Sequence, residues 1–347
     1  METSKFLSLI EEIIDKNISD LHLSTARAPF IRNQTGEIVE VESFGALSAE
    51  DIENVIAMLY GKPFTKTSVD VSFEHKNVRF RVNIFRTIHG ITISMRRILS
   101  VIPDPKDILL PEYILDIANT GKGLILVTGP TGSGKSTTLA TIAQHINKTL
   151  RKHIITLEDP VEFVYKNEKC LINQREYGRH FETFDGGIRS VLREDPDIVI
   201  VGEMRDLETI QAAIELAESG HLVLSTLHTN DTVQTVDRII QSFPKETQNQ
   251  IRMQLSLTLK MVVSQVLIPK ADHSGRVVAR EILVNNDSVR NLILRGQTQH
   301  IYSTVETASQ EGMILMDQSI KNLFKEGLIS EYDALYSMRD RDRLYSD

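Results

Sequence analysis

The stretch Gly129-Pro130-Thr131-Gly132-Ser133-Gly134-Lys135-Ser136 follows an apolar run and leads directly into residues that favour helix. It matches the pattern G-x-x-x-x-G-K-[ST], in which glycines let successive backbone N–H groups face a polyphosphate at the N-terminus of a helix. In such a loop Lys135 reaches the β- and γ-phosphates and Ser136 places its hydroxyl on Mg²⁺, while Thr137 can satisfy N–H groups of the first helical turn. The stretch therefore predicts a site for a nucleoside triphosphate and Mg²⁺.

The length and charge of the chain limit its class. Its 347 residues exceed one typical domain and predict two. The net charge of −8 gives no sign of a large basic face, so we expect no nucleic-acid partner. The single cysteine, Cys170, excludes a disulfide within the chain and a cysteine-built zinc site. No apolar run approaches the ~20 residues of a membrane span and no signal-peptide layout is evident, so we expect a cytoplasmic protein.

Residues 1–100 predict a smaller α+β domain. Phe6, Ile10 and Ile13 have the spacing of one helix face, which fits either a core face or a membrane-surface helix. The acids between them favour the core, because they would repel anionic lipid. Alternating apolar residues predict strands over 20–24, 31–41, 69–73, 78–85 and 91–98.

Two local signals mark where elements of this domain begin and where it ends. Ser48 and Asp51 resemble a capping box in front of a second helix. Pro103 and Pro105 disfavour helix and sheet hydrogen bonding alike, so we place a linker over 101–112.

Residues 113–347 predict a second domain of the α/β class. Helical stretches alternate with expected strands at 123–128, 153–157, 198–201 and 222–225. This alternation predicts a parallel sheet that binds ligands beyond the carboxyl ends of its strands. Beyond Lys245 the pattern predicts mostly helix, with one late strand over 277–284, and we interpret the tail Arg339–Leu344 as a solvated charge run.

Carboxylates follow two of the expected strands. Glu203 follows the buried run 198–201, and Glu158 ends the strand before Pro160. Acids at strand ends are often solvated loop residues, but beside a phosphate-binding loop they are candidates for holding Mg²⁺ or the attacking water. We expect Arg205 to pair structurally with these acids.

Two histidines bracket the strand at 222–225. His221 precedes it and His228 follows it, and both are placed where a γ-phosphate would be sensed. A histidine pair could also indicate zinc, but no third ligand is spaced nearby, which disfavours a metal site.

The motifs GPTGSGKST, ITLEDPVEF, LREDPDIVIVGEMRD and GHLVLSTLHTND, in that order, resemble the secretion-type ATPases, most closely the type IV pilus retraction ATPases of the PilT family. The resemblance implies a RecA-like P-loop NTPase core preceded by a PAS-like N-terminal domain. It implies that Lys135 and Ser136 are Walker A residues and that Glu158 is the catalytic glutamate. Glu203 would be the Walker B glutamate, acting on Mg²⁺ partly through water, and His221 and His228 would be the paired box histidines.

The resemblance also implies an assembly. Family members are hexameric rings that hydrolyse ATP, and Arg81 and Arg96 resemble the arginines that the N-terminal domain brings to the phosphates. It implies a homo-hexamer, peripheral at the inner face of the cytoplasmic membrane, that powers pilus retraction and twitching motility. The implied partners are an inner-membrane platform protein and a paralogous retraction ATPase.

Departures from the family pattern leave two alternatives open. The chain lacks the four-cysteine insertion usual in pilus assembly and type II secretion ATPases, which disfavours that class. The stretch 288–296 matches the family's AIRNLIRE box with Ser288 in place of alanine and without the closing glutamate. His89 stands where the family has an arginine. A weakly hydrolysing accessory subunit of a retraction ATPase therefore stays open as an alternative to the retraction motor itself.

Overall fold

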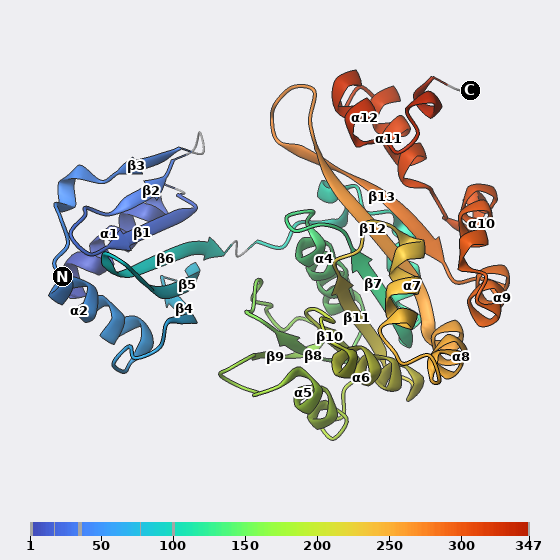
Figure 1. Ribbon diagram of the computed structural model, residues 1–347, viewed down its shortest axis with the longest axis horizontal. Coiled ribbons are helices and arrows are strands. Elements are labelled where there is room, and N and C mark those ends of the chain that lie inside the picture. The colour runs from blue at the N-terminus through green and yellow to red at the C-terminus, as the bar shows by residue number, and fades with distance from the viewer. Residues whose placement is uncertain (1–2, 17, 34–36, 77, 99–100, 346–347) are drawn as a thin grey trace. The chain divides into compact units, whose positions relative to one another are not determined.

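The computed structural model describes residues 3–16, 18–33, 37–76, 78–98 and 101–345. The chain divides after Val101 into two compact units, within the linker predicted at 101–112 (Figure 1). The segment that follows is fastened to the second unit, because Thr141 Oγ1 donates to Pro103 O at 3.3 Å. Arg280 donates from Nη2 to Ile108 O at 2.8 Å and from Nη1 to Leu109 O at 2.7 Å.

The first unit is an antiparallel sheet with the strand order β3-β2-β1-β6-β5-β4 over its described residues. Its strands are β1 (Asp20–Ser24), β2 (Phe30–Arg32), β3 (Ile38–Glu40), β4 (Ser68–His75), β5 (Val78–Thr87) and β6 (Gly90–Ile98). Its helices are α1 (Thr3–Asp15), α2 (Ala49–Tyr60) and the 3₁₀ turn η1 (Glu42–Phe44).

Both α-helices of this unit pack on the sheet through apolar side chains. Phe6, Ile10 and Ile13 of α1 are buried in the same cluster as the inward residues of β5 and β6, so the core interpretation of α1 is confirmed. The capping box at Ser48 and Asp51 is also confirmed, with both reciprocal hydrogen bonds present.

The second unit is built on a sheet with the order β13-β12-β7-β11-β10-β8-β9. Its strands are β7 (Gly123–Thr128), β8 (His153–Glu158), β9 (Leu171–Glu176), β10 (Ile198–Val201), β11 (Leu222–Leu227), β12 (Leu259–Pro269) and β13 (Arg276–Val284). The strands from β12 to β9 are parallel, and β13 is antiparallel to β12. The predicted α/β core with a smaller α+β unit before it is therefore confirmed.

Helices cover both faces of this sheet (Figure 1). The helices α3 (Glu112–Ala118) and α4 (Lys135–Thr149) share one apolar cluster with it. The opposite cluster includes side chains of α5 (Phe184–Val191), α6 (Leu207–Glu218), α7 (Thr232–Gln241), α8 (Gln248–Thr258), α9 (Asp287–Arg295) and α10 (Ile301–Thr307). The far ends of β12 and β13 pack against α11 (Met316–Lys325) and α12 (Glu331–Ser337). Short 3₁₀ turns are η2 (Pro105–Ile108), η3 (Thr298–His300), η4 (Ser309–Glu311) and η5 (Arg341–Leu344).

Three sequence expectations fail in this unit. Helix was expected across β12, because α8 ends at Thr258 and the strand begins at Leu259 with no turn signal between them. The edge strand β9 was missed because its sequence is mostly polar. The tail is not a solvated charge run, since Leu344 is buried with α11 and α12 and Arg339 contacts buried acids.

In the described part of the chain, no helix combines the length and apolarity that crossing a bilayer would require.

Candidate functional site

The P-loop, residues 129–136, connects β7 to α4 and turns on glycines with positive φ. The backbone φ angles of Gly129, Gly132 and Gly134 are 141°, 80° and 86°, which residues other than glycine rarely adopt. A Cβ at Gly129 would also clash with the carbonyl oxygen of Gln265. Gly134 is the N-cap of α4 and has no side chain to cap it, so first-turn N–H groups are left for an anion.

The Lys135 ammonium is held inside this loop. Its Nζ donates to Gly129 O at 2.9 Å and to Pro130 O at 3.1 Å. It also lies 3.4 Å from His228 Nδ1. Burial lowers the pKa of Lys135, while the negative charges of Glu203 and Glu162 act in the opposite direction. A compact positive charge is therefore fixed where a polyphosphate would enter.

Gln265 of β12 supports the P-loop through two side-chain hydrogen bonds that no sequence pattern predicted. Its Nε2 donates to Ser133 O at 2.6 Å, and its Oε1 accepts from Thr138 Oγ1 at 2.9 Å. The side chain is 2% exposed, so neither bond has water as a ready substitute. The parallel register of β12 with β7 explains the contact, because Ser264 is paired with Thr128 and Gln265 follows.

Glu158 ends β8 in a half-buried position with neutral donors around it. Its Oε1 accepts from Thr156 Oγ1 at 2.6 Å and from Gln174 Nε2 at 3.1 Å, and its Oε2 accepts from Glu162 N at 3.4 Å. Burial raises the pKa of Glu158 to about 7, although these hydrogen bonds act to lower it. A carboxyl with this pKa can accept and release a proton at neutral pH.

Glu203, just beyond β10, lies next to Arg205 and His228. Arg205 Nε donates to Glu203 Oε2 at 2.9 Å, and Arg205 also lies 3.3 Å from Asp159. His228 Nε2 lies 3.2 Å from the other Glu203 oxygen. The hydrogen bond with Glu203 raises the pKa of Arg205. The expected pairing of Arg205 with the acids is thus present.

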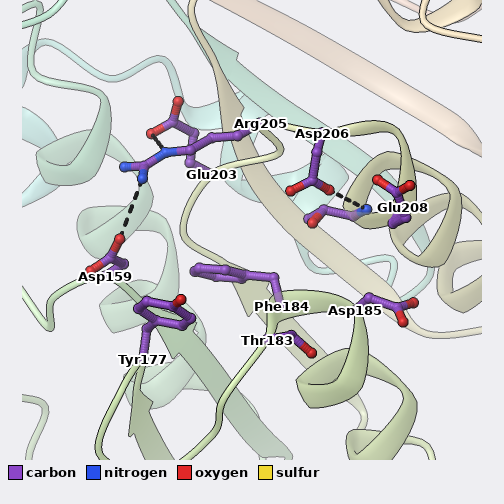
Figure 2. Close-up of a pocket in the computed structure, with 10 residues that line it drawn as sticks. Asp159, Tyr177, Thr183, Phe184, Asp185, Glu203, Arg205, Asp206 and Glu208 are labelled. Atoms are coloured by element: carbon purple, nitrogen blue, oxygen red, sulfur yellow. Dashed lines mark hydrogen bonds and ion pairs between the residues drawn. The ribbon is translucent and has the colours of Figure 1, made fainter.

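A pocket opens beside this pair. It has a volume of about 480 Å³ and is lined by Asp159, Glu203 and Arg205, with Tyr177 and Phe184 below them (Figure 2). Figure 2 shows Arg205 reaching from Glu203 toward Asp159, so the arginine joins the ends of β8 and β10.

The two histidines are not at one site. His228 follows the carboxyl end of β11 and bridges Lys135 and Glu203. His221 precedes the strand, and its carbonyl accepts from Gly123 N at the amino end of β7. A strand of six residues separates them by roughly 20 Å. The prediction that both lie where a γ-phosphate is sensed is wrong for His221 in its own subunit, and at this separation the two histidines of one subunit are too far apart to share a zinc ion.

Arg81 and Arg96 are cross-strand partners on β5 and β6 of the first unit. Arg96 Nε donates to Asp20 Oδ1 at 2.7 Å, whereas Arg81 lies 3.9 Å from Asp70. His89 lies in the turn between the two strands, and its N–H is bonded to Thr87 Oγ1. Together the arginines form a basic pair on one sheet; their action on phosphates stays a prediction.

Known proteins resemble this chain over most of its length. Residues 62–327 match the family described as "Type II/IV secretion system protein". The chain is 45% identical over 290 residues to the twitching motility protein of Neisseria gonorrhoeae, covering 82% of this chain and 78% of that protein. It is 42% identical over 325 residues to the type IV pilus retraction ATPase PilT of Pseudomonas aeruginosa, covering 91% and 93%. A crystal structure of the pilus retraction motor PilT with bound ADP has a TM-score of 0.89 and 40% identity, covering 97% of this chain and 98% of that one.

The Gln265 contacts predict a binding defect. Gln265→Leu leaves Ser133 O and the Thr138 hydroxyl without their buried partner, which costs on the order of 1–3 kcal/mol. We expect ADP affinity to fall about tenfold by titration calorimetry. Gln318→Leu, at an exposed position of α11, serves as the matched control. Equal ADP affinity in the two variants would contradict the supporting role of Gln265.

Proposed function

Because this chain belongs to the type II/IV secretion system protein family, and within it to the pilus retraction ATPases, we propose that it is the ring-forming motor that powers type IV pilus retraction and twitching motility. The observation that carries the proposal is the meeting of the P-loop, Glu158, Glu203 and His228 at the carboxyl edge of one sheet. In this proposal the P-loop binds the phosphates, Glu158 is the base and Glu203 is the carboxylate for Mg²⁺. His228 connects Lys135 of the P-loop with Glu203.

ATP fits the P-loop by the chemistry of its donors. The uncapped start of α4 and the Lys135 ammonium offer positive charge, and the buried Ser133 hydroxyl lacks a hydrogen-bond partner among the described residues. We assign Ser136 and Glu203 to Mg²⁺, which would neutralise charge on the phosphates. The described residues contain no cluster of three His, Cys, Asp or Glu side chains that could chelate a metal, which suits an ion held mainly by phosphate oxygens and water.

In the proposed mechanism, Glu158 orients the attacking water and takes its proton. Its pKa of about 7 suits a group that must bind and release a proton near neutral pH. His228 contacts both Lys135 and Glu203, so it can transmit loss of the γ-phosphate from one to the other. Arg205 keeps Glu203 oriented through its 2.9 Å hydrogen bond.

Mechanical work requires the first unit to respond to this chemistry. We assign Arg81 and Arg96, from the same or a neighbouring subunit, to the phosphates of bound ATP, so that hydrolysis releases a clamp. In this proposal the chain works as a homo-hexamer at the inner face of the cytoplasmic membrane. It engages an inner-membrane platform protein, with a paralogous retraction ATPase as a further partner.

Glu158→Gln tests the base. A neutral amide cannot take a proton, so we expect kcat to fall by roughly 10²-fold or more while nucleotide affinity is kept. Steady-state hydrolysis and ADP titration measure the two quantities. Glu168→Gln, an exposed change on the same connecting segment, is the matched control. If Glu158→Gln and Glu203→Gln both kept wild-type turnover while Lys135→Ala lost it, the assignment of the acids would be wrong.

The pKa of the Glu158 carboxyl predicts how kcat depends on pH on the acid side. Because the folded-state pKa of Glu158 is raised to about 7, its carboxyl becomes protonated as pH falls through that value and the base is lost. We therefore expect kcat to decline below about pH 7 in the wild-type enzyme. A profile flat down to about pH 5 would assign proton transfer to another group.

A deletion strain tests the cellular role and separates the alternatives. Loss of a retraction motor leaves pili extended and abolishes twitching, whereas loss of an assembly ATPase removes the pili. We expect surface pili to persist, and expect complementation by the wild type but not by Lys135→Ala. Purified protein with negligible turnover alone but strong stimulation of a paralogous ATPase would instead identify an accessory subunit.

A further inference from the structure

Arg339, in the segment after α12, contacts the loop that carries His228. Its Nη2 lies 3.1 Å from Asp231 Oδ2 and 3.4 Å from Asn230 O. Its Nη1 lies 3.9 Å from Glu281 Oε2. Asp231 is 0% exposed and Glu281 is 1% exposed, so this arginine at the surface pairs with two fully buried carboxylates.

Charge explains why these contacts matter. A buried carboxylate is costly unless it is paired and hydrogen-bonded, so removing its cation leaves an uncompensated charge. Burial lowers the pKa of Arg339, but the negative charges of Glu281 and Asp231 raise it by more. The pKa of Arg339 therefore lies above its ordinary value. Burial and the negative charge of Asp231 raise the pKa of Tyr302, on α10, to about 12.

Both acids also hold the start of α7, directly behind the His228 loop. Asp231 is the N-cap residue, and its Oδ1 accepts from Gln234 N at 2.7 Å. Glu281 Oε1 accepts from both the N–H and the hydroxyl of Thr232 at 2.8 Å. Arg339 therefore acts on the two groups that fix where this helix begins.

The opposite side of the loop is tied to the P-loop strand. Thr229 Oγ1 lies 2.7 Å from Thr235 Oγ1, which lies 3.4 Å from Thr128 Oγ1 at the end of β7. The loop 228–231 is thus held between the nucleotide site and the C-terminal segment.

The backbone of the C-terminal segment is anchored in turn on α11. Arg339 N donates to Asp317 Oδ1 at 2.9 Å, and Asp340 N donates to Asp317 Oδ2 at 3.0 Å. Met316 N donates to Glu281 Oε2 at 3.3 Å, which joins the start of α11 to the same acid. The His228 loop and the start of α11 are thus joined through Glu281 and Arg339.

We propose that Arg339 is a positioning residue for the His228 loop and couples the nucleotide state of the site to the C-terminal helices α11 and α12. The proposal rests on the assignment of His228 to the nucleotide site. Coupling of this kind is reciprocal, so nucleotide must change the protection of the C-terminal segment if that segment affects nucleotide. An ion pair that only fastened the tail would change thermal stability and nothing else.

Hydrogen exchange of the full-length wild type gives the first test. The Arg339 and Asp340 amides report directly, because both are bonded to Asp317. We expect ADP to change exchange in peptides covering 338–345 by about fivefold or more. Exchange rates identical with and without ADP would overturn the proposal, and this measurement needs no variant to fold.

Substitutions give the second test. In Arg339→Ala we expect ADP affinity to change by up to the factor by which ADP alters exchange of the tail, kcat to fall roughly tenfold, and the ADP effect on the tail to disappear. Arg339→Lys should recover part of kcat, because it keeps the charge but not the forked geometry. Arg343→Ala is the matched control, since Arg343 pairs at the surface with Glu306 at 2.9 Å. A wild-type kcat in Arg339→Ala, or an equal fall in kcat in Arg343→Ala, would contradict the proposal.

His228→Ala separates this proposal from the one on which it rests. Wild-type turnover in His228→Ala would refute the assignment of His228 to hydrolysis. A slow His228→Ala together with a fast Arg339→Ala would leave the function intact and refute the coupling.

Discussion

Hydrogen bonding between four parallel strands brings the P-loop, Glu158, Glu203 and His228 to one edge of the sheet. In register, Thr128 of β7 lies beside Leu227 of β11, and Val201 of β10 lies between Ser225 and Leu157. The loop or side chain that follows each strand therefore emerges at the same edge. A slip of one residue in any strand would turn its side chains to the opposite face, so the alignment depends on burial of both faces.

Two carboxylates at this edge differ in their surroundings, and that difference separates their chemistry. Glu203 lies 2.9 Å from Arg205 Nε and 3.2 Å from His228 Nε2, and we propose that it holds Mg²⁺. Glu158 instead receives hydrogen bonds from neutral Thr156 and Gln174, and burial brings its pKa near neutrality. A carboxyl whose pKa lies near neutrality is suited to move protons, which is the role proposed for Glu158.

Local patterns predicted the features that depend on local chemistry. The P-loop, the strand ends at Glu158 and Glu203, and the capping box at Ser48 follow from spacing and turn chemistry alone. His221 was misplaced although the sequence already put it before the strand and His228 after it, because residues at the two ends of one strand lie at opposite edges of the sheet. The structure shows β12 where no Gly or Pro separates it from α8, so periodicity could not mark the change from helix to strand. Contacts of Gln265 and Arg339 join segments far apart in sequence, and no local pattern reports them.

The hairpin of β12 and β13 explains how such distant segments meet. Gln265 is paired in register with Arg280, and the next rung pairs Ser264 with Glu281. Neighbouring residues on a strand point to opposite faces, so two rungs serve both sides of the sheet. One face holds the P-loop through Gln265 and the segment after Pro105 through Arg280, while the other holds the start of α7 and the tail through Glu281. Because both rungs belong to one hydrogen-bonded ladder, the P-loop, the backbone of Ile108 and Leu109, and the C-terminal segment all contact the same pair of strands.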